Sequence, residues 1–267
     1  MAAQLTLTTA YNKDTLKSYK KNIYFSAPLK IGEPRSEDDR LHMIFMMASA
    51  GILKGDELIY DITCEKASKL LITEQSYSKL FDMGTDGSAK KHMSINVQEN
   101  ASLIYRPCAV VPFKNSCFVS ETDIRIDKGG EIFWSDIFTA GRVAMGESFA
   151  FRHYENRTRV WYDNELVWLD KCNLIPAEFD MTNMYYYRNY THQGTCFYCG
   201  DEEKENMLLD IDISDKKYPR VYAGITRAKK GVCVRVLANQ SQDIEELFSD
   251  IEAVITGESN KYLQSDT

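Results

Sequence analysis

Cys196 and Cys199 are the residues whose types and spacing most directly suggest chemistry. Two cysteines separated by two residues can form half of a zinc site or a redox pair. A zinc site needs a second pair, and Cys172 and Cys233 stand alone in the sequence. In an extended strand, residues three apart point to opposite faces, and free cysteine is among the most buried residue types. We therefore expect both cysteines to pack in the core, with a metal-binding or redox role as the alternative.

Asp136 is a carboxylate on what should be the apolar face of a strand. The segment Glu131–Phe138 alternates, so Asp136 shares a face with Ile132 and Trp134. A buried carboxylate is unfavourable unless it is paired or hydrogen-bonded. We expect Asp136 to form an ion pair with Arg142 or to accept a hydrogen bond from a loop amide. The alternative is that it lines a wet internal passage.

Two further acids directly follow glycines: Asp56 follows Gly55, and Glu147 follows Gly146. A glycine lets the backbone turn and present the carboxylate to its surroundings. Capping of a turn or loop is the usual role for such an acid. We expect this role for both residues, with contact to a metal ion as the alternative.

The loop that contains Glu147 begins at Gly141 and carries the opposite charge of Arg142. Strand-like segments flank it, so the chain must turn there, and glycine allows the turn without a Cβ clash. Arg142, and Lys79 elsewhere in the chain, suit a pairing role with these acids or contact with a partner protein.

The histidines and the known catalytic motifs give no further site. His42, His92, His153 and His192 are widely spaced, so the sequence predicts no tight imidazole site. The sequence contains no nucleophile elbow, phosphate loop or dinucleotide fingerprint. This pattern favours a binding protein over an enzyme.

A cluster of tyrosines is the best candidate for a protein contact. Four tyrosines and an arginine, the residue types that dominate interface hot spots, lie within six residues. They are Tyr185, Tyr186, Tyr187, Arg188 and Tyr190. The alternative is a strand or loop edge that covers a junction between two parts of the fold.

A repeat of about 30 residues predicts the architecture that positions these groups. Each copy has an alternating strand, an acidic or amide turn, a small residue and a second strand. The copies begin at Ile62, Ile95 and Ile124, which are 33 and 29 residues apart, and a looser fourth copy begins at Val160. The period-2 pattern makes each copy a β-hairpin or β-arch. We expect a mostly β protein with an elongated, stacked, β-helix-like body over residues 1–190.

The remaining residues, 191–267, predict a small α+β unit in one continuous fold with the body. It reads as strand, helix, strand, strand, helix, followed by a polar tail beyond Gly257 that we expect to be mobile. The last helix has a predicted N-cap at Asp243, with Glu246 completing a capping box.

Composition limits the partners and the compartment. The net charge of −7 over 267 residues argues against nucleic acid, and the longest apolar run, 11 residues, is too short to span a membrane. The N-terminus lacks the pattern of a signal peptide, and seven cysteines, an odd number, point to a reducing environment. We expect a cytoplasmic protein.

Four motifs in order resemble the UreD, or UreH, family of urease accessory proteins, over most of the chain from about Ser49 to the last helix. They are Gly55-Asp56, the run from Leu70 to Lys79, the segment from Pro107 to Phe113, and the run from Gly141 to Glu147. Within the second motif, Glu74 separates Thr73 from Gln75, a pair that the family keeps together.

The resemblance implies a mostly β, elongated protein with two helices that is not an enzyme. It implies binding to the accessory protein UreF, through UreF to the GTPase UreG, and docking on the urease apoprotein to help nickel reach its site, with a dimer formed as part of that complex. No tightly bound cofactor is expected, but nickel could pass in transit along Asp56, Asp136 and Glu147, since carboxylates hold nickel weakly and exchange it. A stacked-β carbohydrate-binding protein is a further alternative, with Trp134, Trp161 or Trp168 lining its groove.

Overall fold

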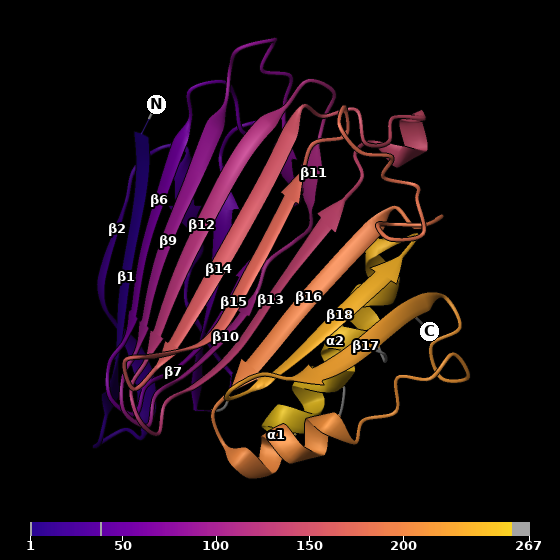
Figure 1. Ribbon diagram of the computed structural model, residues 1–267. Helices are drawn as coiled ribbons and strands as arrows, with labels where there is room; N and C mark the ends of the chain where they lie inside the picture. The colour runs from indigo at the N-terminus through magenta and orange to yellow at the C-terminus, as the bar shows by residue number, and fades with distance from the viewer. Residues whose placement is uncertain (1, 38, 258–267) are drawn as a thin grey trace, which may run out of the picture.

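The computed structural model describes residues 2–37 and 39–257, which form two β-sheets packed face to face with two helices at one end (Figure 1). The seven-stranded sheet has the order β15-β14-β12-β9-β6-β1-β2. Its strands are β1 (Ala2–Asn12), β2 (Lys17–Phe25), β6 (Glu57–Cys64), β9 (Ala89–Val97), β12 (Cys117–Ile126), β14 (His153–Tyr162) and β15 (Glu165–Leu174).

The eleven-stranded sheet runs β17-β18-β16-β13-β10-β7-β5-β3, with three short strands attached beside this path. Its main strands are β3 (Leu29–Ile31), β5 (Arg40–Met47), β7 (Lys69–Glu74), β10 (Ser102–Arg106), β13 (Glu131–Thr139), β16 (His192–Cys199), β17 (Val221–Arg227) and β18 (Val232–Ala238). The attached strands are β4 (Arg35–Glu37), β8 (Ser78–Leu80) and β11 (Val110–Pro112).

The predicted repeat is confirmed as a stack of β-arches, each giving one strand to each sheet. Ile95 pairs in parallel register with Ile62 on one side and Ile124 on the other. In the opposite sheet, the second strands of the copies stack in the same way, through Leu70, Leu103 and Ile132. The residues aligned by the repeat are therefore neighbours in space, and their side chains form the core between the sheets.

The turns of the three arches share one backbone device. Ala67, Asn100 and Gly129 occupy the same register and all have positive φ, at 61°, 58° and 81°. The small residue that follows is Ser68, Ala101 or Gly130, and in each turn its N–H donates to the carbonyl three residues earlier. The shared small residue of the repeat is therefore the position where the chain enters the crowded second strand.

The fourth copy departs from the stack. Its first strand continues the register, with Val160 beside Ile124. Its second strand, β15, returns antiparallel to β14 in the same sheet. Asp163 and Asn164 both have positive φ, which is the conformation of a two-residue hairpin turn. The copy is therefore a hairpin and not an arch.

The C-terminal residues extend the eleven-stranded sheet. β16 pairs antiparallel with β13. Backbone hydrogen bonds of the sheet therefore join the predicted body, residues 1–190, to the predicted C-terminal unit, residues 191–267. Helices α1 (Glu202–Leu209) and α2 (Ser241–Thr256) pack with β16–β18 around a second apolar core. The close approach of α2 requires Gly194, since a Cβ there would lie 2.4 Å from Ile244 Cγ2.

Two predictions about the C-terminal end have different outcomes. The predicted N-cap at Asp243 is wrong: α2 begins three residues earlier, at Ser241 with Gln240 as N-cap, and Asp243 binds Arg220 at 2.6 Å. The predicted polar tail lies beyond Gly257, outside the described residues. Within the described part, no helix is long and apolar enough to span a bilayer.

Candidate functional site

The loop Gly141–Glu147 is closed by its own charges. Glu147 Oε1 accepts a hydrogen bond from the Lys114 backbone N–H at 2.6 Å, and its other oxygen binds the Arg142 guanidinium. That guanidinium lies 4.4 Å from the centre of the Phe113 ring. The bond from Arg142 holds the pKa of Glu147 below its ordinary value. Both oxygens of Glu147 are thus engaged in shaping the loop.

The two glycines of this loop are not equivalent. Gly141 has a φ of +136°, and a Cβ there would lie 2.9 Å from Glu147 O and 3.0 Å from Pro112 O. Gly146 has a φ of +73° and open space around it. Gly141 is therefore required by close backbone packing as well as by its conformation.

The turn at Gly55 and Asp56 has the same capping character. Gly55 has a positive φ of 80°, and the Asp56 carboxylate accepts a hydrogen bond from the Leu53 N–H at 2.9 Å. Lys79, in β8, is exposed and lines a surface groove of about 170 Å³. Asp56 and Glu147 lie in turns and do not line the cavity that contains Asp136.

Asp136 lies between the sheets and does not bind Arg142. Its carboxylate accepts a hydrogen bond from Asn156 Nδ2 at 2.8 Å, across the gap from β13 to β14. The expected partner, Arg142 or a loop amide, is thus corrected to a side-chain amide of the facing sheet. Burial raises the pKa of Asp136 to about 7, and the nearby charge of Asp170 adds to the rise.

A cavity of about 40 Å³ surrounds Asp136, which exceeds the space that one water molecule needs. Polar side chains from both sheets line it together with apolar ones. The polar residues are Tyr60, Glu74, Ser78, Lys91, Tyr105, Ser120, Thr122, Asp136, Tyr154 and Asn156. The space beside this carboxylate is therefore large enough for a water molecule.

Glu74 is a second interior carboxylate that the sequence interpretation missed. It ends β7 and accepts a hydrogen bond from Tyr105 Oη at 3.1 Å, and burial raises its pKa. The cavity and the surface groove both include Glu74, Tyr60 and Ser78, so Glu74 lies where the two meet. Alternation along β7 could have revealed it, because Glu74 shares its face with the buried Leu70 and Ile72.

Asp170 and Arg235 form an ion pair beside this interior, with Arg235 Nη2 2.6 Å from Asp170 Oδ1. Asp170 comes from β15 and is buried, whereas Arg235 comes from β18 and is exposed. The charge of Asp170 raises the pKa of Asp136, and that of Arg235 lowers it. The pair therefore sets part of the electrostatic environment of Asp136.

The cysteines of the Cys-x-x-Cys sequence lie on opposite faces of β16. Cys199 belongs to the core between the sheets, whereas Cys196 belongs to the core beneath α2. Burial raises the pKa of the Cys199 thiol to about 12 and that of Cys196 well above its ordinary value. The two thiols therefore cannot bind one metal ion together, nor act as an exposed redox pair.

No group of three or more His, Cys, Asp or Glu side chains in residues 2–37 and 39–257 is placed to hold a metal ion. The four histidines contact different residues: His42 contacts Thr73, His92 contacts Glu121, His153 contacts Asn173 and His192 contacts Thr191. The carboxylates that the interior offers are those of Glu74 and Asp136, which line one cavity.

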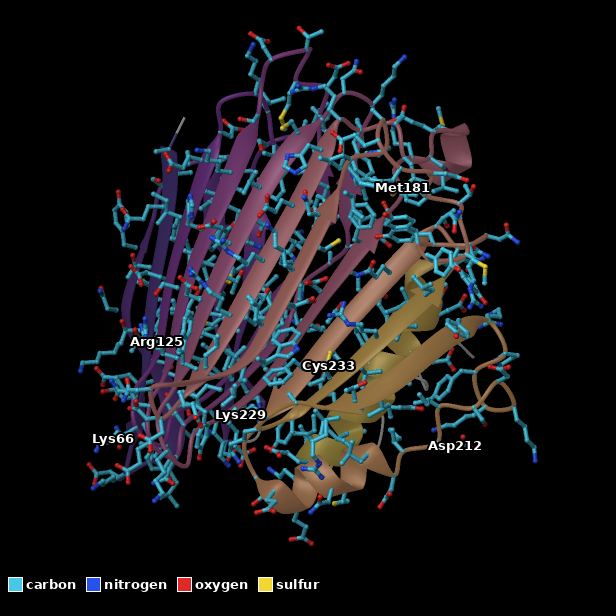
Figure 2. The ribbon with its side chains drawn as sticks, in the orientation of Figure 1. Lys66, Arg125, Met181, Asp212, Lys229 and Cys233 are labelled. Carbon is cyan, nitrogen blue, oxygen red and sulfur yellow. The ribbon has the colours of Figure 1, made fainter. Side chains whose placement is uncertain are left out.

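The outer face of the seven-stranded sheet is polar and carries paired charges. Arg157 binds Glu121, and Arg159 binds Asp123 at 2.6 and 2.8 Å. Arg125, which points into solvent in Figure 2, lies 4.8 Å from the centre of the Trp161 ring. Trp134 and Trp168 are buried, so these tryptophans do not form an open aromatic groove for a sugar.

The tyrosine cluster divides into exposed and buried members. Tyr185 is 84% exposed and Tyr186 39%, and Phe179, Met184 and Tyr222 are also exposed. We call these five residues the aromatic patch. Phe179 packs against Tyr186 with ring centres 5.8 Å apart, and Tyr222 lies under Arg188 of the same loop. Tyr187, in contrast, is 2% exposed and donates a hydrogen bond to Gln193 Oε1, so it belongs to the core and does not face a partner. Arg188 stacks over Tyr222 at 4.5 Å.

Comparison with known proteins gives one consistent result. The model of the family described as UreD urease accessory protein matches residues 1–264. Urease accessory protein UreH of Helicobacter hepaticus is 34% identical, covering 88% of this chain and 91% of that protein. Urease accessory proteins UreD of Acetivibrio thermocellus and Actinobacillus pleuropneumoniae are 29% and 28% identical, covering 90% and 96% of this chain and 92% and 96% of theirs.

Proposed function

The chain belongs to the UreD family of urease accessory proteins, and from this premise we propose that it is a cytoplasmic binding protein that helps deliver nickel to urease. In this proposal it is not an enzyme. It binds UreF, reaches the GTPase UreG through UreF, and docks on the urease apoprotein within a dimeric accessory complex.

The observation that carries the nickel part of the proposal is the polar cavity between the sheets. Glu74 and Asp136 place carboxylate oxygens in it, and Glu74 also borders the surface groove. Carboxylate oxygens and water hold nickel weakly compared with thiolate or imidazole ligands. An ion can therefore enter, exchange between these oxygens and leave.

The positions of the other candidate acids, Asp56 and Glu147, exclude them from the proposed nickel route. Asp56 and Glu147 cap turns with their carboxylates, so we assign the route to Glu74 and Asp136. Nickel is cargo in this proposal, and no resident cofactor is required.

The aromatic patch supports the partner part of the proposal. Exposed tyrosine, methionine and phenylalanine side chains are enriched in protein interfaces, and here they gather beside the edge of the eleven-stranded sheet. We assign the aromatic patch to the contact with UreF.

Deletion and complementation test the function as a whole. A cell lacking this chain should make urease protein of normal size and amount that contains little nickel and has little activity. Restoring the chain should restore both. Full nickel content without the chain would overturn the proposal.

A further inference from the structure

Lys91 is a positive charge inside the nickel cavity that no predicted motif includes. It lies on β9, where the side chains of Met93 and Ile95 face the core, and it lines the same cavity as Glu74 and Asp136. Its ammonium lies 5.4 Å from the centre of the Tyr60 ring. Its sequence neighbour Lys90 is exposed on the outer face of the same strand.

The surroundings of Lys91 are electrostatically complementary to its positive charge, because the Tyr60 ring and the two carboxylates line the same cavity. The interaction is reciprocal, since the charge of Lys91 lowers the pKa of Glu74 and of Asp136. Lys91 therefore acts electrostatically on both carboxylates of the cavity.

A cavity with two carboxylates and no counter-charge would attract a divalent cation strongly, since interior charges are poorly screened. Strong attraction would conflict with transfer, because an ion that binds tightly does not leave. The single charge of an ammonium offsets one of the two carboxylates. It also repels an entering divalent ion.

We propose that Lys91 is a resident cation that competes with nickel for Glu74 and Asp136 and thereby keeps the cavity from retaining the metal ion. The inference rests on the proposed nickel route and adds a residue that sets its affinity. When nickel enters, the flexible lysine side chain moves away from the cavity. When nickel leaves, the ammonium returns.

Nickel binding to the purified full-length chain tests this inference, with nickel chloride as the titrant in calorimetry. Lys91→Met keeps the length and apolar stem of the side chain but removes its charge. Because the ammonium repels the divalent ion in a poorly screened space, its loss should tighten binding about tenfold to a hundredfold. Lys91→Arg, which keeps the charge, should bind like the wild type, and so should Lys90→Met, which removes a lysine from the outer face.

A gain in affinity that depends on Asp136 separates this mechanism from misfolding, because a damaged fold would bind nickel through exposed cysteine and histidine side chains without Asp136. Adding Asp136→Asn to the Lys91→Met chain should abolish the gain in nickel affinity. This loss would show that the additional nickel binding occurs in the cavity. Unchanged or weaker binding by Lys91→Met would overturn the inference, as would a gain that persists without Asp136, or no nickel binding by any variant. Urease activation in cells tests the proposed nickel delivery separately. A failure of nickel delivery is therefore distinguished from a failure of the inference about Lys91.

Discussion

Replacing Asp136 with asparagine should stabilise the protein, and the gain should grow as the pH rises. The folded protein raises the pKa of this carboxyl from 3.8 to about 7, chiefly by burial. Between these values the folded chain binds a proton that the unfolded chain has lost, so ionisation destabilises the fold increasingly with pH. This contribution is small below pH 4 and complete above pH 7.

The magnitude follows from the pKa difference. About three pH units at about 1.4 kcal/mol each give an upper limit near 4 kcal/mol above pH 7. Water in the cavity and relaxation of the site reduce this figure, so we expect about 1 to 3 kcal/mol at pH 8. The Asn156 amide can still donate to the oxygen of an asparagine, so the substitution removes the charge and keeps the hydrogen bond.

Urea unfolding of the wild type and of Asp136→Asn, at pH 5 and pH 8, measures the effect. The stability difference should be larger at pH 8 by about 1 to 2 kcal/mol. Asp61→Asn is the matched control, because Asp61 is exposed on the outer face of the seven-stranded sheet, and it should change little at either pH. A difference that is independent of pH, or that shrinks as the pH rises, would refute the assignment of Asp136 as a destabilising charge between the sheets.

Three further predictions concern the loop, the cysteines and the aromatic patch. Gly141→Ala should destabilise the fold by about 2 kcal/mol or more and Gly146→Ala by about 1 kcal/mol, because both glycines have positive φ but only Gly141 is crowded. Thermal unfolding of the two variants will rank these effects. Equal destabilisation would contradict this reasoning. Cys196 and Cys199 should not react with a thiol reagent at pH 8 until the protein is denatured, because both thiols are buried and their pKa values are raised. Peptide mass mapping measures the labelling of each cysteine. Rapid labelling of the native protein would support the redox alternative. Tyr185→Ala should reduce co-purification of UreF at least tenfold, whereas Tyr24→Ala, also exposed but on β2, should not; equal retention would remove the patch from the UreF contact.

The repeat made the stacked part of the fold predictable from sequence. Side chains alternate with period 2, and the turns require a left-handed residue followed by a small one, so both constraints recur visibly every 30 residues or so. The stack of arches ends at Asp163 and Asn164, because two successive left-handed residues close a hairpin. The loose alignment of the fourth copy obscured this signal in the sequence.

The site was harder to predict, because its residues meet only through long-range packing. The inward position of Asp136 followed from alternation within one strand. Its partner Asn156 could not be identified that way, since it comes from the facing sheet. Glu74 and Lys91 were missed for a related reason: each looks like an ordinary charged residue until the two sheets are placed face to face.

The central claim is that the carboxylates between the sheets carry nickel toward urease. The most direct test is the nickel content of urease purified from cells whose only copy of this chain is the double variant Glu74→Gln and Asp136→Asn. The variant must first be shown to assemble with UreF as the wild type does, and Asp61→Asn serves as the outer-face control. We predict that urease from the double variant contains less than about a tenth of the nickel found with the wild type or the control, since neutral amides attract a divalent ion far less than carboxylates. Full nickel loading of urease by an assembled double variant would contradict the account.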